Sequence, residues 1–410
     1  MTFDTALTHR RSSACRVHHS RLATRSLSTF VATLQACALA LAMQAACSAQ
    51  DLLTVRIGLV APTSGALAAT GWANQRGAQF AIDEVNAQRL KIGDRRANFE
   101  LLAEDDAGDP RQGTSVAQKL VDAKVNGVVG HQTSGSTLPA SRLYSEAGIP
   151  QISPSSTAPK FTRQGFQTAF RLAPDDDAIA SALAMYAVKE LKLKRIAIVD
   201  DRTAYGHGIS EIFSKGVSDA GSTIVSHDYV NDKAFDFTAL LTTLKAKKPE
   251  AIFVGGMYSI AAPMLRQMKQ LGITARMLGG DGICLEDLVK LSNGSAYDGQ
   301  VICVEAGGPN KAKQDRLDTF RAAFRKKFGT DPEPVSMYSY DAVWVMVDSM
   351  RKAGSADPKL YLSALAKTQG YSGLSGSISF DAKGDLLHPS ISFYTFRGGT
   401  REQVGAVQMR

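Results

Sequence analysis

Two loops rich in serine and threonine hold the residues of this chain that are best suited to bind a ligand. The first, GHQTSGSTLPAS, spans 130–141, and the second, QISPSSTAP, spans 151–159. Each follows a short apolar segment bounded by Gly or Pro, which predicts a buried strand, and each is expected to open into a helix. The first N–H groups of a helix lack a partner within it, so such loops predict a site for a small carboxylate without Arg or Lys.

Hydroxyl side chains would add donors to this anion site. The donors expected there are Ser134, Ser136, Ser155, Ser156 and Thr157. The alternative is that these hydroxyls only cap their own helices, as most Ser and Thr residues in such positions do. The presence of two such loops in one α/β unit leaves both interpretations open.

A carboxylate that could bind the opposite charge lies in the segment GGDG at 279–282. We expect Asp281 at the tip of a strand, where a closed cleft would remove it from water. A buried carboxylate is costly unless it is paired, so Asp281 could be the counter-ion of a ligand ammonium. It could also simply form the turn between the glycines. An anion site across a cleft favours the counter-ion.

Enzymatic and metal chemistry have weaker support. His131 lies near Ser134, but the Gly-x-Ser-x-Gly pattern and an acid partner are missing, so hydrolysis stays a third hypothesis. The segment 108–114 has the glycine spacing of a phosphate loop without its Lys. The histidines outside the first 50 residues have no metal-ligand spacing. We therefore expect no enzyme, no metal and no cofactor.

The first 49 residues are expected to be a cleaved export signal. Five Arg and one Asp precede an apolar run from 27 to 46, and small residues lead to a cut near Ala49. The run is short and rich in Ala for a membrane span. Cys47 could mark a lipoprotein, but Gln44 stands where a branched apolar residue is expected, so we favour simple cleavage. The predicted location is the periplasm.

Charge and cysteine usage narrow the class of protein further. Without the leader, the formal net charge falls from +8 to +4, and the basic residues are scattered along helices, so nucleic acid is not expected as a partner.

Of five Cys, only Cys284 and Cys303 lie outside the leader. Export would place them in an oxidising compartment, and we favour a disulfide over two separate buried thiols.

Strands and helices alternate along the chain from residue 52, and the pattern restarts after about residue 174. Strands separated by single helices must run parallel, because a parallel connection needs a crossover. The prediction is an α/β fold of two doubly wound parallel sheets, joined by three crossing segments around a hinged cleft. Lobe 1 would hold 52–173 plus 306–379, and lobe 2 would hold 174–305 plus 380–410. The segment PSISFYTFRGG is expected as an antiparallel edge strand.

Taken in order, several segments resemble extracytoplasmic solute-binding proteins for branched-chain amino acids, of the leucine/isoleucine/valine-binding type. They are VRIGLVAPTSGALAATG at 55–71, the two loops above, RIAIVDDRTAYGHG at 195–208 and MLGGDG at 277–282. The resemblance spans nearly the whole mature chain. It implies a periplasmic-binding-protein type I fold and a free amino acid held between two lobes. It also implies delivery to the membrane permease of an ABC transporter, and we expect a monomer.

Motif matches carry the ligand contacts of that family onto this chain. The resemblance assigns the ligand carboxylate to Ser134 and Thr157 with the backbone of Ser155 and Ser156. It assigns the ligand ammonium to Asp281 and a further ligand contact to Tyr205.

The pocket for the ligand side chain departs from the family pattern. Thr70 and Met257 stand where aromatic residues are usual, with Trp72 and Tyr258 close by. The expected walls are Thr70, Trp72, Gln132, Met257 and Tyr258. An apolar or branched amino acid is favoured, but the resemblance does not fix the side chain. A sensory subunit on the same fold, binding amides, aromatic acids or other small carboxylates, stays open as an alternative.

Overall fold

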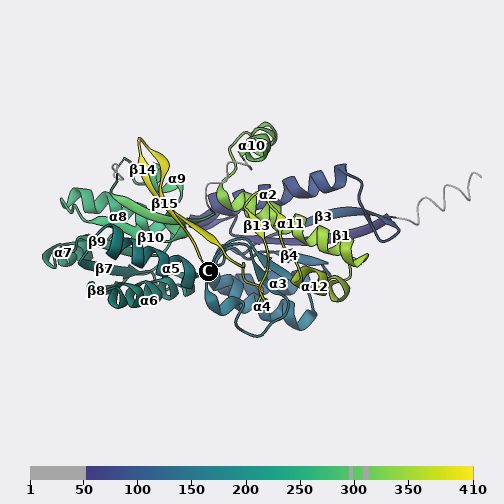
Figure 1. The fold of residues 1–410 in the computed structure, drawn as a ribbon, viewed down its shortest axis with the longest axis horizontal. Helices are drawn as coiled ribbons and strands as arrows, with labels where there is room; N and C mark the ends of the chain where they lie inside the picture. Colours follow the sequence, from purple (N-terminus) through teal and green to yellow (C-terminus); the bar gives the residue numbers. More distant parts are fainter. Residues whose placement is uncertain (1–51, 295–298, 308–313, 410) are drawn as a thin grey trace, which may run out of the picture. The chain divides into compact units, whose positions relative to one another are not determined.

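The computed structural model describes residues 52–294, 299–307 and 314–409. These residues form two α/β bodies, each built around its own sheet (Figure 1). The expected export signal at 1–49 lies outside the described residues. Within the described ranges, no helix is long and apolar enough to cross a bilayer.

The first sheet has six strands in the order β2-β3-β1-β4-β5-β6. They are β1 (Leu52–Ala61), β2 (Lys91–Ile92), β3 (Arg95–Asp105), β4 (Gly127–Val129), β5 (Gln151–Ser153) and β6 (Ala169–Arg171). Strands β1, β4, β5 and β6 pair in parallel. The connecting helices are η1 (Gly65–Leu67), α2 (Ala68–Ala87), α3 (Pro110–Asp122), α4 (Ser134–Ala147) and η2 (Pro159–Phe161).

The second sheet has seven strands in the order β15-β14-β11-β10-β9-β7-β8. They are β7 (Arg195–Asp200), β8 (Thr223–Tyr229), β9 (Ala251–Gly255), β10 (Arg276–Gly279), β11 (Val301–Ala306), β14 (Ser390–Arg397) and β15 (Thr400–Gln408). Its helices are α5 (Asp176–Met185), η3 (Tyr186–Glu190), α6 (Ala204–Asp219), α7 (Thr238–Ala246), α8 (Tyr258–Gln270), η4 (Asp281–Ile283) and α9 (Glu286–Leu291). Strands β7 to β11 are parallel, and β14 and β15 are antiparallel additions.

The remaining helices follow β11 and return to the first sheet. They are α10 (Gln314–Phe328), α11 (Pro334–Ala353) and α12 (Pro358–Ala366), followed by the short pair β12 (Tyr371–Ser372) and β13 (Ser377–Ile378). Helix α11 packs against α2 (Figure 1). The described chain thus passes between the sheets at three places, after β6, after β11 and before β14. We call the first sheet with α2–α4 and α10–α12 the first lobe, and the second sheet with α5–α9 the second lobe.

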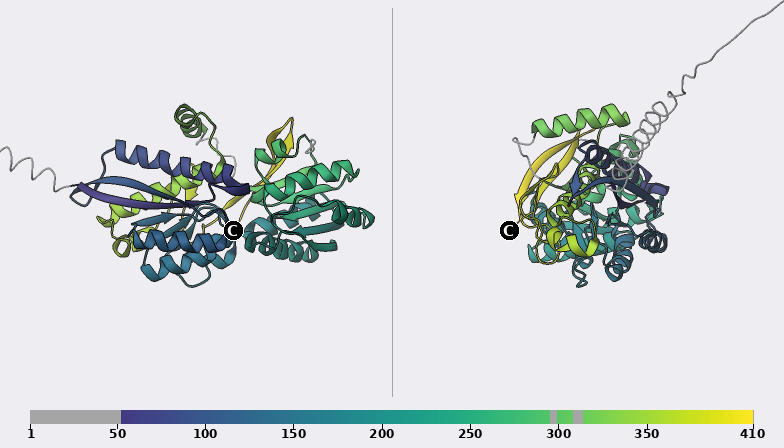
Figure 2. Two further views of the ribbon diagram at one scale, coloured as in Figure 1. Left: turned by 180° about the vertical axis from the view of Figure 1, so that it is seen from behind. Right: turned by 90° about the vertical axis from the view of Figure 1, so that its right-hand side faces the viewer.

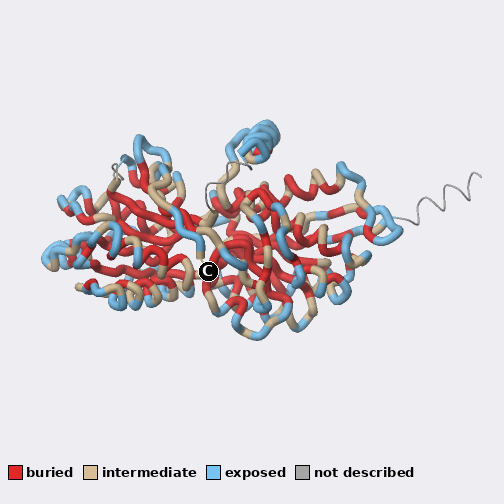
Figure 3. The backbone as a smooth tube through the Cα atoms, in the orientation of Figure 1, coloured by how far each residue is buried: buried red, intermediate tan, exposed pale blue. Residues whose placement is uncertain are grey.

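Apolar strands flanked by helices on both faces form the two cores. Val55, Ile57 and Leu59 of β1 are fully buried, and so are Ile252 and Val254 of β9. Figure 3 shows the strands of both sheets as mostly buried, with exposed residues along the outer helices. Strands covered on both faces read as continuous apolar runs, so the sequence pattern identified them.

Two sequence expectations about local structure were wrong. The second Ser/Thr loop opens into the single 3-10 turn η2, and the next α-helix begins only at Asp176, because strand β6 intervenes after Gly165, whose φ is 83°. The predicted edge strand β14 is paired on both sides, and β15 forms the edge. Gly398 and Gly399, both with positive φ, turn the chain so that 400–408 folds back on β14 (Figure 2, yellow).

Candidate functional site

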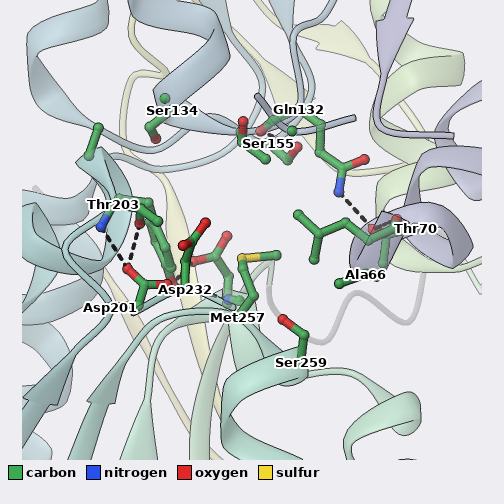
Figure 4. A pocket seen from close by; sticks show the side chains of 18 of the residues that line it. Ala66, Thr70, Gln132, Ser134, Ser155, Asp201, Thr203, Asp232, Met257 and Ser259 are labelled. Carbon is green, nitrogen blue, oxygen red and sulfur yellow. Dashed lines mark hydrogen bonds between the residues drawn. The ribbon is translucent and has the colours of Figure 1, made fainter. Parts of the chain in front are cut away.

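A cavity of about 1110 Å³ is lined by residues of both lobes (Figure 4). The predicted site residues that line it are Thr70, Gln132, Ser134, Ser155, Tyr205, Met257 and Asp281. Ser156, Thr157 and Tyr258 are buried but do not line it. Trp72 also stands outside the lining, with 45% of its surface exposed. The predicted donor Ser136 is buried as well and does not line the cavity, so the fold gathers most predicted ligand residues around one space and leaves five outside its wall.

The first Ser/Thr loop leads from β4 into α4. Thr133 caps this helix by accepting a hydrogen bond from the Ser136 N–H at 3.4 Å. The Oγ of Ser134 accepts from the Ala158 N–H at 3.2 Å and from the Ser156 hydroxyl at 3.3 Å. Capping therefore falls to a residue that sequence analysis did not name, and the Ser134 hydroxyl joins the two loops.

The second loop is shaped by Arg171 of β6, whose side chain is fully buried. Its guanidinium donates to the carbonyl oxygens of Ser156 at 2.8 Å and Ala158 at 2.9 Å, and its Nε pairs with Asp385 at 2.6 Å. In a planar trans peptide the N–H points opposite to the carbonyl. Because the Ser156 carbonyl faces the guanidinium, the N–H of Thr157 is directed away from Arg171.

A chain of buried hydrogen bonds holds the first loop at His131. Nδ1 of His131 lies 2.9 Å from an Asp106 carboxylate oxygen, and Nε2 lies 3.1 Å from the hydroxyl of Tyr144. All three side chains are inaccessible to solvent. Both ring nitrogens of His131 are thus occupied by groups other than Ser134, so the hypothesis of a His131–Ser134 pair loses its base.

On the second lobe, Asp281 begins the short helix η4 directly after β10. One of its carboxylate oxygens accepts from the Tyr205 hydroxyl at 2.9 Å, and that hydroxyl accepts from the Gly282 N–H at 3.1 Å. Tyr205 lies at the start of α6. A Cβ on Gly280 would come within 2.7 Å of the Tyr205 hydroxyl, so glycine permits this approach. Burial raises the pKa of the Asp281 carboxyl to about 6, although the Tyr205 hydrogen bond lowers it.

Two further carboxyl groups near Asp281 were missed by sequence analysis. Glu305, at the end of β11, lines the cavity with 8% of its surface exposed. Burial raises its pKa to about 7, in spite of the Arg401 guanidinium 3.5 Å away. Asp176 is fully buried at the start of α5, and burial together with the charge of Asp281 raises its pKa well above the usual range. An acidic residue inside the apolar strand VICVEA was the available signal for Glu305.

The turn that carries Asp281 is fixed covalently to the next strand. Cys284 and Cys303 form a disulfide with their Cα atoms 5.2 Å apart, which confirms the sequence prediction. Arg401 adds a hydrogen bond to the Cys284 carbonyl at 2.8 Å. The same bridge therefore ties η4 to β11, the strand that supplies Glu305.

Part of the cavity wall is apolar. Its apolar residues are Ala66, Leu67, Met257, Leu285, Pro334 and Val335, and the polar residues Thr70, Gln132 and Ser259 also belong to the lining. The amide of Gln132 is turned towards Thr70 and donates to its hydroxyl at 2.7 Å (Figure 4). The two polar side chains therefore bind each other, and the wall around them offers mostly carbon.

The sequence of this chain is similar to those of known binding proteins. The model of the periplasmic binding protein family matches residues 54–400. "Leu/Ile/Val-binding protein homolog 1" of Brucella abortus is 33% identical over 354 residues, which cover 86% of this chain and 93% of that protein. The "Amino acid binding protein" of Pseudomonas aeruginosa is 33% identical over 352 residues, covering 85% of this chain and 92% of that protein.

A solved structure shows the same fold with a ligand. The branched-chain amino acid transporter substrate-binding protein LivJ of Streptococcus pneumoniae, in complex with isoleucine, superposes with a TM-score of 0.80. It is 29% identical in sequence, and the match covers 87% of this chain and all of that chain. Two α/β lobes with parallel sheets are thus common to both proteins.

Proposed function

Because this chain belongs to the periplasmic binding protein family, we propose that it is an extracytoplasmic receptor for a free amino acid with a branched or other apolar side chain. The observation that carries this proposal is the opposition of two kinds of group across one cavity. Ser134 and Ser155 face it from the first lobe, and Asp281 with Tyr205 faces it from the second. A zwitterion is the ligand that matches both sides.

The carboxylate of the ligand would bind the first lobe. The Ser134 hydroxyl and the start of α4 supply neutral donors, and the partial charge of the helix start favours an anion. Thr157 was also expected to contact the carboxylate, but it does not line the cavity. In this proposal the second loop contacts the carboxylate through Ser155, which does line it.

The ammonium of the ligand would bind Asp281. Tyr205 donates to one carboxylate oxygen, and a carboxylate has further lone pairs that can accept from the ammonium. Burial makes an unpaired Asp281 costly, and the ammonium supplies the missing positive charge. Among the residues that the structure describes, Asp281 forms no ion pair, and the Arg401 guanidinium is bonded to Cys284 and Glu305.

The side chain of the ligand would lie among Leu67, Met257 and Val335. These residues give it an apolar surface, which fits a branched aliphatic group. The "Leu/Ile/Val-binding" name of the Brucella relative and the isoleucine in the Streptococcus complex agree with this choice.

Binding would couple to closure of the lobes. The cavity volume of about 1110 Å³ lies above the ~300–1,000 Å³ of typical small-molecule pockets, so a single amino acid would not fill it. A ligand that contacts both lobes favours the state in which both contacts are made. The Tyr258 hydroxyl already donates to the Ala66 carbonyl across the lobes at 3.3 Å. We propose that the closed form delivers the amino acid to an ABC permease, that the receptor acts as a monomer, and that residues 1–49 direct its export.

Calorimetry with matched ligands tests the proposal. Leucine, isoleucine and valine should bind to the purified mature protein. The keto acid of leucine lacks the ammonium, and isopentylamine lacks the carboxylate, so both should bind at least about 100-fold more weakly. Equal affinity for leucine and its keto acid would remove Asp281 from its proposed role. Absence of binding by all three amino acids would refute the proposed function.

A further inference from the structure

A continuous line of buried side chains runs from the apolar end of the cavity into the first lobe. The Thr70 hydroxyl donates to the Leu67 carbonyl at 2.9 Å, and Gln132 donates to Thr70. The Asn74 amide donates to the Gln132 oxygen at 2.5 Å, and the Ser339 hydroxyl donates to the Asn74 oxygen at 2.5 Å. The four polar side chains in this line are at most 6% exposed.

The direction of every hydrogen bond in this line follows from its first member. A carbonyl oxygen can only accept, so the Thr70 hydroxyl must donate to Leu67 and accept from Gln132. The nitrogen of Gln132 therefore faces Thr70, and its oxygen faces Asn74. By the same reasoning, the nitrogen of Asn74 faces Gln132, and its oxygen accepts from Ser339. The line has one consistent polarity from α2 to α11.

Within this line, Asn74 differs from its neighbours in position. Thr70 and Gln132 line the cavity, whereas Asn74 does not contact it. It is 1% exposed and donates to the side-chain oxygen of Gln132, the one acceptor of the Gln132 amide group. Buried acceptors without a partner are costly, so a freed Gln132 oxygen would favour a ligand that carries a donor.

We infer that Asn74 is a specificity-determining positioning residue, which keeps the side-chain end of the cavity apolar by holding the Gln132 oxygen away from the ligand. The inference rests on the proposed function, since it specifies how the amino-acid site rejects polar side chains. The class of ligand rejected has a side-chain hydrogen-bond donor and nearly the size of leucine, such as glutamine or asparagine.

The test is the ratio of affinities for leucine and glutamine, measured by calorimetry on the full mature protein. The unchanged protein should prefer leucine. Asn74→Ala should lower the ratio by about tenfold, because one hydrogen bond is gained with glutamine and an unpaired acceptor remains with leucine. If Asn74 had a purely structural role, Asn74→Ala would lower the affinities for both ligands equally and leave their ratio constant.

Asn86→Ala is the matched control. Asn86 lies on the same helix α2 and also holds backbone through its amide, with bonds of 2.9 and 2.8 Å to Phe99, but it does not line the cavity. Its variant should lose stability with an unchanged ratio.

A double variant completes the design. Asn74→Ala with Gln132→Leu removes the freed amide, so the preference for leucine should return. A ratio within twofold of the unchanged protein in Asn74→Ala overturns the inference, and so does a low ratio that persists in the double variant. If Asn74→Ala does not fold, the nearly isosteric Asn74→Asp, which places an acceptor against the Gln132 oxygen, must shift the ratio in the same direction. Failure of the unchanged protein to bind any amino acid would refute the proposed function instead.

Discussion

The two walls of the cavity use different chemistry for opposite tasks. The first lobe presents neutral donors, among them Ser134 and Ser155, and the second presents the carboxylate of Asp281 backed by Tyr205. Neutral donors keep their character at all pH values, whereas a carboxylate changes charge. The carboxyl groups Asp281 and Glu305, with pKa values raised to about 6 and about 7, lie on the second wall, so sensitivity to pH near neutrality is expected from that wall.

The supports of the two walls differ as well. The first loop is held by non-covalent contacts, among them the bonds of His131 to Asp106 and Tyr144. The Asp281 turn is held by the Cys284–Cys303 disulfide. Since the disulfide is a covalent constraint, the second wall is the one that a reductant can weaken. Mutation, reduction and acid are therefore expected to affect the two walls differently.

Loss of the charge on the second wall should have the largest effect. Asp281→Asn keeps the size of the side chain but removes the counter-ion of the ammonium, so leucine affinity should fall about 100-fold or more in calorimetry. The exposed pair Lys215–Asp219 provides the control, since Asp219→Asn should leave the affinity unchanged. If Asp281→Asn bound leucine within threefold of the unchanged protein, the proposed charge contact on the second wall would be contradicted.

Removal of the disulfide should come next in size. The bridge closes 19 residues of chain, for which the loop-entropy model gives a loss of about 3 kcal/mol in the free energy of unfolding. Cys284→Ser with Cys303→Ser should therefore unfold at a lower urea concentration than the oxidised protein. Dithiothreitol should reproduce the loss in the unchanged protein and have no effect on the double variant. Equal stability of all these forms would contradict a structural role for the bridge.

Acid should weaken leucine binding through Asp281. Its pKa is raised to about 6, and the ammonium binds the ionised form, so protonation competes with the ligand. Affinity should be nearly constant above about pH 7 and should fall towards a tenfold loss per pH unit below about pH 6. In Asp281→Asn this dependence should flatten, and a steep dependence that survives in the variant would place the titrating group elsewhere.

Unfolding does not account for such a loss, because the same groups have the opposite effect on stability. The pKa values of Asp281, about 6, and Glu305, about 7, lie above their usual ranges, so the folded state binds these protons more tightly than the unfolded state. Their contribution to the stability of the ligand-free protein therefore increases as the pH falls from about 8 to 5. Thermal melts over this range provide the control for the binding series.

A single hydroxyl of the first wall should have the smallest effect. Ser134→Ala removes one neutral donor while the start of α4 and the backbone of the second loop remain, so leucine affinity should fall about fivefold. The reduced affinity should show the same pH dependence as the unchanged protein. A loss as large as that of Asp281→Asn would show that the two walls are not different in kind.

Sequence was sufficient for those features that depend on local pattern. Apolar strands followed by Ser/Thr loops, the GGDG turn and a lone cysteine pair are visible in the chain, and the fold and the disulfide were predicted from them. The resemblance added Tyr205 to the Asp281 already predicted from the GGDG turn, and both residues line the cavity.

Features that depend on tertiary packing could not be predicted from the sequence. Glu305 lies near Asp281 only because β10 and β11 pair in parallel. Trp72 lies on α2, between cavity-facing Thr70 and buried Asn74, yet is largely exposed, because adjacent helix positions face different directions. The second loop was expected to open an α-helix, and its actual shape depends on Arg171, whose contact with Asp385 crosses more than 200 residues of chain.

That contact has a consequence for the time at which the receptor becomes functional. Arg171 orients the carbonyls of the second loop, and its own buried charge is balanced by Asp385, which also accepts from Thr162. A nascent or truncated polypeptide that ends before Asp385 would bury a cation without a partner beside the loop. Ligand capture is therefore expected only after nearly the entire polypeptide, including Asp385, is present.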